Sequence, residues 1–184
     1  MPERLLLVRH SLPERAPGRA PPEWPLCDEG RARAHALAES LAVYAPLEVF
    51  SSPEPKAQQT AEVIAQRHGT QVQVRAGLRE HGPRTYEPSA ARFQHEIERL
   101  LRDPGRQTSL AVETGREALA RFEAAVSSSA LSAGGTPCVV SHGTVITLLV
   151  ASHNDIDPVA FWRDLAMPAV VELSANDLTL CPRA

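Results

Sequence analysis

The sequence predicts an α/β protein, a three-layer α/β/α domain with a mostly parallel central sheet. Two apolar runs, residues 5–8 and 138–140, are too short for a helix core and suit central strands buried on both faces. A histidine follows two residues after the end of each run, His10 after the first and His142 after the second. Strand-like and helix-like segments alternate along the rest of the chain, a pattern typical of parallel sheets. No change in composition divides the chain, so we expect one domain over residues 1–184.

The first half of the chain predicts helices and strands in alternation. A loop crowded with prolines follows the first strand and excludes a regular helix there. Asp28 stands where an N-cap is expected, and Pro55 and Gly69 stand where a second helix would begin and stop. Val72 and Val74 alternate with polar residues and are expected to face inward from a strand. The expected elements are a helix over 28–41, a strand over 47–50, a helix over 55–68 and a strand over 71–75.

The second half continues the alternation. Ser89 is a candidate cap for a helix that ends at Asp103, where Pro and Gly follow. Thr114 or Gly115 opens the next helix, and small residues over 127–135 lead to the next strand. The expected elements are helices over 89–102, from 114 or 115 onward and over 145–150, and strands over 138–141, 169–173 and 178–181.

Composition excludes several classes of protein. A chain of 184 residues is long enough to bury about 70% of the surface that it exposes when unfolded. Its net charge of −3 gives no basic surface for nucleic acid. No apolar run approaches the roughly 20 residues that cross a membrane, and the N-terminus lacks a signal-peptide pattern, so we expect a cytoplasmic protein without a membrane partner. Cys27, Cys138 and Cys181 are odd in number and form no CxxC pattern, so we expect reduced thiols.

Polar and charged residues gather where the strands are expected to end. The ends of successive strands are followed by Arg9 and His10, by Lys56, by Glu80 and by His142. In open α/β sheets, ligands bind at the carboxyl ends of the strands. Three cationic groups around one histidine, with a single carboxylate near them, describe a pocket for a dianion such as a phosphoryl group. A histidine with one unprotonated ring nitrogen is a competent nucleophile toward phosphorus.

Short motifs at these positions follow one another along the chain. They are Leu7-Val8-Arg9-His10-Ser11, residues 52–61, Leu78-Arg79-Glu80 and Val140-Ser141-His142-Gly143. They resemble L-V-R-H-G, S-P-L-x-R-A-x-Q-T-A, L-x-E and V-S-H-G, the signatures of the histidine phosphatase superfamily, the phosphoglycerate-mutase-like proteins. Residues 26–30 stand where that family has L-T-x-x-G. The resemblance covers nearly the whole chain in the family's order, and it implies the phosphoglycerate-mutase-like fold.

The resemblance also implies a role for each residue. His10 would attack phosphorus and carry a phosphohistidine. The phosphoryl oxygens would be held by Arg9, Lys56 and protonated His142. Glu80 would protonate the departing oxygen and then take a proton from the hydrolytic water. Gly143 would let backbone N–H groups approach the anion. The family's chemistry uses no metal and no cofactor, and we expect neither here.

Some positions depart from the family pattern. Ser11 replaces a glycine, so the turn there is expected to be less tight. Lys56 replaces an arginine, and a lysine cannot make the bidentate fork of a guanidinium. The residues after Glu80 also differ from the family, so Glu87 stays open as the alternative proton donor.

These observations predict a phosphatase that acts on a phosphorylated small molecule through phosphohistidine on His10. Mutase-type phosphotransfer and dephosphorylation of phosphohistidine on a protein stay open as enzymatic alternatives. Because of Ser11 and Lys56, a phospho-ligand binding module that has lost turnover is the non-enzymatic alternative. Trp24 and Trp162 are interpreted as packing residues rather than as a platform for substrate.

Overall fold

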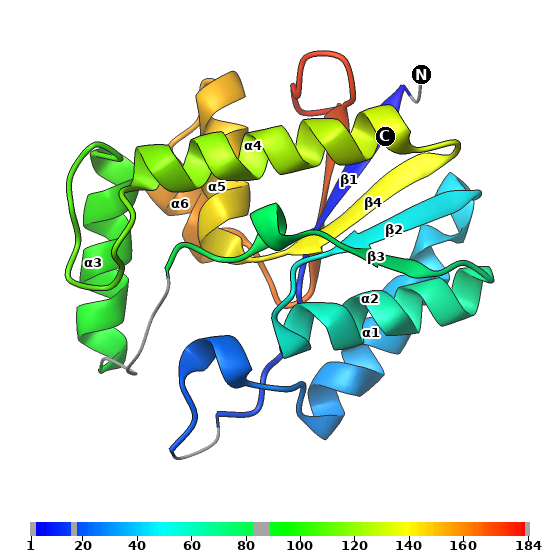
Figure 1. Ribbon diagram of the computed structural model, residues 1–184, viewed down its shortest axis with the longest axis horizontal. Coiled ribbons are helices and arrows are strands. Elements are labelled where there is room, and N and C mark those ends of the chain that lie inside the picture. Colours follow the sequence, from blue (N-terminus) through cyan, green and yellow to red (C-terminus); the bar gives the residue numbers. More distant parts are fainter. Residues whose placement is uncertain (1–2, 16–17, 83–88, 183–184) are drawn as a thin grey trace.

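The computed structural model describes residues 3–15, 18–82 and 89–182. A five-stranded sheet in the order β3-β2-β4-β1-β5 forms its centre, with β5 antiparallel to β1 and the other neighbouring pairs parallel (Figure 1). The strands are β1 (Arg4–Arg9), β2 (Leu47–Ser51), β3 (Val72–Val74), β4 (Thr136–Ser141) and β5 (Ala169–Ser174). The predicted α/β fold with a mostly parallel sheet is confirmed.

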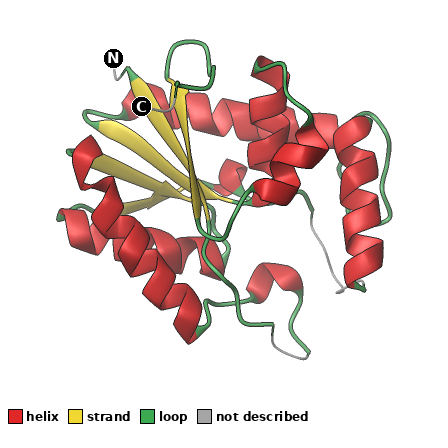
Figure 2. Cartoon of the chain, turned by 180° about the vertical axis from the view of Figure 1, so that it is seen from behind, coloured by secondary structure: helices red, strands yellow, loops and turns green. Residues whose placement is uncertain are grey.

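Helices cover both faces of this sheet, which gives the three layers (Figures 1 and 2). One face carries α1 (Asp28–Ser40) and α2 (Pro55–His68). The other carries α3 (Ala90–Arg102), α4 (Gly115–Ser132), α5 (Gly143–His153) and α6 (Pro158–Asp164). Single 3-10 turns lie between them: η1 (Pro21–Glu23), η2 (Leu41–Tyr44) and η3 (Ala76–Leu78).

The apolar run of β1 explains why both faces are covered. Successive side chains of a strand point to opposite faces. Leu5 and Leu7 accordingly belong to the core under α4 and α5, whereas Leu6 and Val8 belong to the core under α1 and α2. All four side chains are fully buried. A strand buried on both faces therefore reads as an unbroken apolar run in the sequence.

Capping residues set most helix ends as predicted. Helix α2 begins at Pro55 and ends before Gly69, whose φ of 64° is the left-handed conformation that glycine adopts without strain. Helix α4 opens on a capping box between Thr114 and Glu117. The prediction for α1 was wrong by one residue. Its N-cap is Cys27, whose Sγ accepts a hydrogen bond from Gly30 N at 3.3 Å, and Asp28 is the first helical residue.

Other elements also differ from the prediction. Val74 is 46% exposed, because β3 is a three-residue strand at the edge of the sheet. The expected strand over 178–181 is reduced to one isolated bridge between Leu173 and Leu180. The small residues after 127, to which the prediction assigned no element, continue α4 to Ser132, since small side chains other than glycine are compatible with a helix. Helix α6 was not predicted.

The sheet brings the polar ends of β1, β2 and β4 together. β4 lies between β1 and β2, with Arg9 paired to Ser141. The backbone ladder continues past the strands, since His10 N donates to Ser141 O at 2.9 Å and Ser52 N donates to Val140 O at 3.0 Å. The side chains that follow these strands therefore emerge at one edge. Within the described residues, no helix has both the length and the apolar character that crossing a membrane requires.

Candidate active site

His10 follows β1 directly and is 6% exposed. Its Nδ1 lies 2.7 Å from the carbonyl oxygen of Ser11. A carbonyl only accepts hydrogen bonds, so Nδ1 carries the proton and Nε2 is left unprotonated. Burial holds the pKa of His10 well below its ordinary value, and the nearby charges of His142, Lys56 and Arg9 lower it further. The imidazole is therefore neutral at physiological pH.

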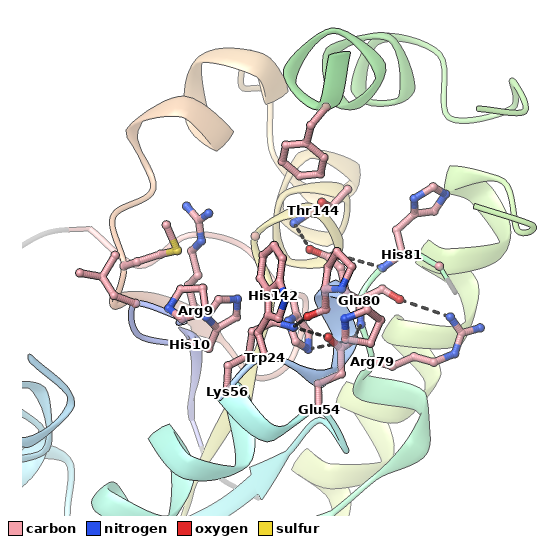
Figure 3. Close-up of a pocket in the computed structure, with 18 of the residues that line it drawn as sticks. Arg9, His10, Trp24, Glu54, Lys56, Arg79, Glu80, His81, His142 and Thr144 are labelled. Carbon is pink, nitrogen blue, oxygen red and sulfur yellow. Dashed lines mark hydrogen bonds and ion pairs between the residues drawn. The ribbon is translucent and has the colours of Figure 1, made fainter. Parts of the chain in front are cut away.

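His142 follows β4 and is fully buried beside His10 (Figure 3). The two ring centroids lie 5.1 Å apart, with the ring planes inclined at 64°. Nε2 of His142 lies 2.7 Å from the hydroxyl oxygen of Ser52 and 3.4 Å from Oε1 of Glu54. The two histidines thus have different neighbours, a backbone carbonyl for one and a carboxylate for the other.

Arg9 and Lys56 are two of the three predicted cationic groups. Nη1 of Arg9 donates to the carbonyl of Leu165, and its Nε is buried without a hydrogen-bond partner among the residues that the structure describes. Burial lowers the pKa of Arg9, and the charge of Glu80 partly offsets this. A Cβ on Gly143 would lie 3.0 Å from Arg9 Nε, so this glycine makes room for the guanidinium.

Lys56 lies in the first turn of α2 and is 6% exposed. Its Nζ donates to Glu54 Oε2 at 2.5 Å and to the carbonyl of Pro21 at 2.8 Å. An ammonium group has three donors, so one N–H of Lys56 remains for a ligand after these two bonds.

Glu54 corrects the expectation of a single carboxylate at the site. It is 9% exposed and contacts both Lys56 and His142, and its Oε1 also accepts a hydrogen bond from Glu80 N at 2.9 Å. Glu54 occupies the leucine position of the S-P-L-x-R motif. Because the family has an apolar residue at that position, comparison with the motif assigned no role to Glu54. A charged residue at an apolar motif position was the signal that could have identified it.

Glu80 lies over the first turn of α5. Its Oε1 accepts from His81 N at 2.8 Å and from Val145 N at 3.3 Å, and its Oε2 accepts from Thr144 N at 3.2 Å. The amides at the start of α5, which we expected to face an anion, thus hold the carboxylate of Glu80. The alternative residue, Glu87, lies outside the described residues.

The loop that carries Glu80 is fixed by Glu113, which the sequence analysis did not identify. Arg79 donates to both carboxylate oxygens of Glu113 at 2.8 Å, and Arg121 donates to Oε1 at 2.6 Å. Gly82 N donates to the same carboxylate at 3.0 Å. Burial alone would raise the pKa of Glu113, but these hydrogen bonds outweigh it and lower the pKa. Glu113 follows no strand and matches no motif, so only the folded chain reveals it.

Ser11 fits the position of the family's glycine. Its hydroxyl donates to Gly30 O at 2.7 Å, and its backbone N donates to Thr60 Oγ1 at 3.0 Å. Thr60 belongs to the second motif, whose Gln59 accepts from Leu26 N at 2.8 Å. These motif residues therefore fasten the loop after β1 to α2 and hold His10 in place.

A pocket of about 470 Å³ contains all the predicted site residues (Figure 3). Its polar part is lined by Arg9, His10, Glu54, Lys56, Glu80, His142 and Gly143. Trp24 and Trp162 also line it, so their interpretation as packing residues alone was incomplete. In the part of the chain that the structure describes, no group of three or more His, Cys, Asp or Glu residues is arranged to hold a metal ion.

Comparison with known proteins identifies the family. The model of the histidine phosphatase superfamily (branch 1) matches residues 5–178. The chain belongs to the histidine phosphatase superfamily. Its resemblance to that family, inferred from the motifs, is confirmed. A search of curated protein sequences found no match.

Solved structures of superfamily phosphatases share the fold. The native structure of a mycobacterial glucosyl-3-phosphoglycerate phosphatase is 25% identical with a TM-score of 0.71, covering 94% of this chain and 90% of that one. Its complex with VO3 is 26% identical with a TM-score of 0.70, covering 94% and 93%. A phosphoserine phosphatase mutant from Entamoeba histolytica is 17% identical with a TM-score of 0.66, covering 92% and 89%, and at that identity it supports the fold alone.

Proposed function

We propose that this superfamily member is a phosphatase that hydrolyses a phosphomonoester of a small molecule through a phosphohistidine on His10. The observation that carries the proposal is the buried, neutral imidazole whose Nδ1 is bound to Ser11 O. This arrangement leaves Nε2 with the lone pair that attack on phosphorus requires. Membership of the superfamily supports phosphatase activity, and the mycobacterial relative is a phosphatase of glucosyl-3-phosphoglycerate.

In the first step, Nε2 of His10 forms a bond to phosphorus while the bond between phosphorus and the ester oxygen breaks. The negative charge on the phosphoryl oxygens is offset by Arg9, by the remaining N–H of Lys56 and by protonated His142. Glu80 gives a proton to the departing oxygen, so that the alcohol leaves neutral. In the second step, water attacks phosphorus and gives a proton to Glu80. The P–N bond then breaks, which releases phosphate and restores the neutral imidazole.

Rapid-quench labelling tests the proposal. Enzyme mixed with a radiolabelled phosphomonoester and quenched within milliseconds should carry an acid-labile, base-stable label that maps to His10. His10→Ala should lose both the label and turnover, whereas His95→Ala, a change at an exposed histidine of α3, should retain them. A label on another residue, or turnover by His10→Ala at the wild-type rate, would overturn the mechanism. Binding of the phosphomonoester without any label on the protein and without release of phosphate would indicate the binding module instead.

A further inference from the structure

A set of apolar side chains lines the pocket beside the phosphate site. This apolar wall consists of Leu12, Pro21, Trp24, Phe93, Trp162 and Met167. Its members come from three parts of the chain: the loop after β1, which includes η1; helix α3; and helix α6 together with the loop that follows it. Figures 1 and 2 show that η1 and α3 flank the same end of the sheet. Segments far apart in the sequence thus converge on one cavity.

The aromatic members of the wall hold their positions through contacts outside the cavity. Trp24 is 8% exposed, and its Nε1 donates to Arg19 O at 3.2 Å, so its polar edge has a partner. Phe93 and Trp162 pack together, with ring centroids 6.1 Å apart, and both also lean on the main core. Both rings nevertheless stay half-buried, with part of their surface facing the pocket. Partly open aromatic rings in a cavity are a binding surface for an apolar ligand.

Two cations that line the pocket, Arg79 and Lys56, argue against a leaving group that would carry a second negative charge beside them. Arg79 is engaged by both oxygens of Glu113, and Lys56 is engaged by Glu54. A carboxylate or second phosphate would have to compete with these pairs for either cation. Arg15 also lines the pocket, with its guanidinium 5.9 Å from the centroid of the Trp24 ring.

We propose that the apolar wall binds the alcohol part of the substrate, and that the substrate class is phosphomonoesters of apolar, above all aromatic, alcohols. This inference rests on the proposed function, because the wall and His10 line the same cavity. A volume of about 470 Å³ accommodates a phosphoryl group together with a ring or a short alkyl chain. The substrate would then differ in kind from a phosphorylated sugar acid.

Binding of phosphonates tests the wall without depending on turnover, since a C–P bond is not hydrolysed by this chemistry. We would measure the Kd of methyl-, propyl-, pentyl- and benzylphosphonate by calorimetry, with the phosphonate analogue of 3-phosphoglycerate as the polar comparison. Each methylene buried against the wall should tighten binding about fourfold. Trp162→Leu should raise the Kd of benzylphosphonate about 2- to 12-fold relative to the wild type. Phe161→Leu, on the same helix but outside this pocket, is the matched control and should preserve the wild-type Kd values.

The outcomes separate this inference from the proposed function. Kd values that do not change with chain length, or tighter binding of the glycerate analogue, overturn the apolar assignment even if phosphomonoesters are hydrolysed. A steep dependence on chain length without any turnover supports the wall and overturns the phosphatase. Circular dichroism and Tm establish that Trp162→Leu is folded. If it is not, Phe93→Leu replaces it, and a folded Phe93→Leu that binds benzylphosphonate as tightly as the wild type contradicts the proposal.

Discussion

Glu54→Gln should strengthen the binding of inorganic phosphate, because the carboxylate of Glu54 repels an anion bound to Lys56. The carboxylate lies 2.5 Å from Lys56 Nζ. A phosphoryl oxygen accepting the remaining N–H would lie about 5 Å from that carboxylate. Two unit charges at that distance repel by roughly 3 kcal/mol when the effective dielectric constant is about 20. Glutamine removes this charge and keeps an oxygen that can accept from Glu80 N.

A repulsion of roughly 3 kcal/mol corresponds to a change of about 150-fold in Kd. Because relaxation of the pocket reduces the repulsion, we expect Glu54→Gln to bind phosphate about 10- to 150-fold more tightly than the wild type. The same change should destabilise the free protein. Lys56 then keeps a buried positive charge without its carboxylate, and breaking a buried ion pair costs up to about 3–5 kcal/mol. Phosphate should therefore raise the Tm of Glu54→Gln more than it raises the Tm of the wild type.

Calorimetric titration with phosphate gives the Kd, and product inhibition of nitrophenyl phosphate hydrolysis gives an independent value. Glu62→Gln is the control, since it makes the same change of charge at an exposed position of α2. A folded Glu54→Gln protein that binds phosphate no more tightly than the wild type would refute the repulsion between Glu54 and the ligand.

Three further predictions concern the roles of Lys56, Glu80 and Glu113. Lys56→Ala should lower kcat/KM about 10- to 150-fold, the value of a charge-assisted hydrogen bond, while Lys56→Arg retains activity; equal kcat/KM in Lys56→Ala and the wild type would exclude contact with the phosphoryl group. Glu80→Gln should lower kcat for alkyl phosphates far more than for nitrophenyl phosphate, whose phenolate leaves without a proton; the same pattern in Glu87→Gln instead would show that Glu87 is the acid. Glu113→Gln should lower Tm at pH 7, and the difference from the wild type should shrink as the pH falls below about 4.5, because a carboxylate with a lowered pKa stabilises the fold only while it is ionised. A Tm difference that does not change with pH would contradict that origin.

The sheet was predictable because its central strands are buried on both faces. Burial of Leu5 to Val8 in two cores demands an unbroken apolar run, and few other structures produce one of that length. Helix ends were predictable where a cap is local, as at Ser89 and Thr114. The sequence predicted the edge strand β3 less well than the central strands. At an edge strand, whether a side chain is buried depends on which elements cover the strand. The alternation of Val72 and Val74 with polar residues does not indicate that β3 is short and that Val74 is exposed.

The predicted site residues were brought together because strand ends share an edge, a rule that needs no knowledge of side-chain contacts. The contacts themselves could not be predicted. Glu113 reaches Arg79 across 34 positions of the chain, and no pattern in the sequence links them. Glu54, by contrast, lies only two residues before Lys56 in the sequence. Its importance depends on burial. An exposed pair of this kind would contribute little to stability, whereas a buried pair places a negative charge next to the ligand.

The two histidines show most clearly how the fold assigns chemistry to similar motifs. Each follows a buried strand and precedes a small residue, so only the resemblance to the family motifs, and not the local pattern, distinguishes them in the sequence. In the folded chain, His10 faces a carbonyl through Nδ1 and has charged groups nearby, which disfavours a second proton and leaves Nε2 the lone pair that the proposed mechanism requires. Nε2 of His142 lies 3.4 Å from the carboxylate of Glu54 and 2.7 Å from the hydroxyl of Ser52. Two imidazoles whose ring centroids lie only 5.1 Å apart therefore meet different neighbours, which is why we propose His10 and not His142 as the nucleophile.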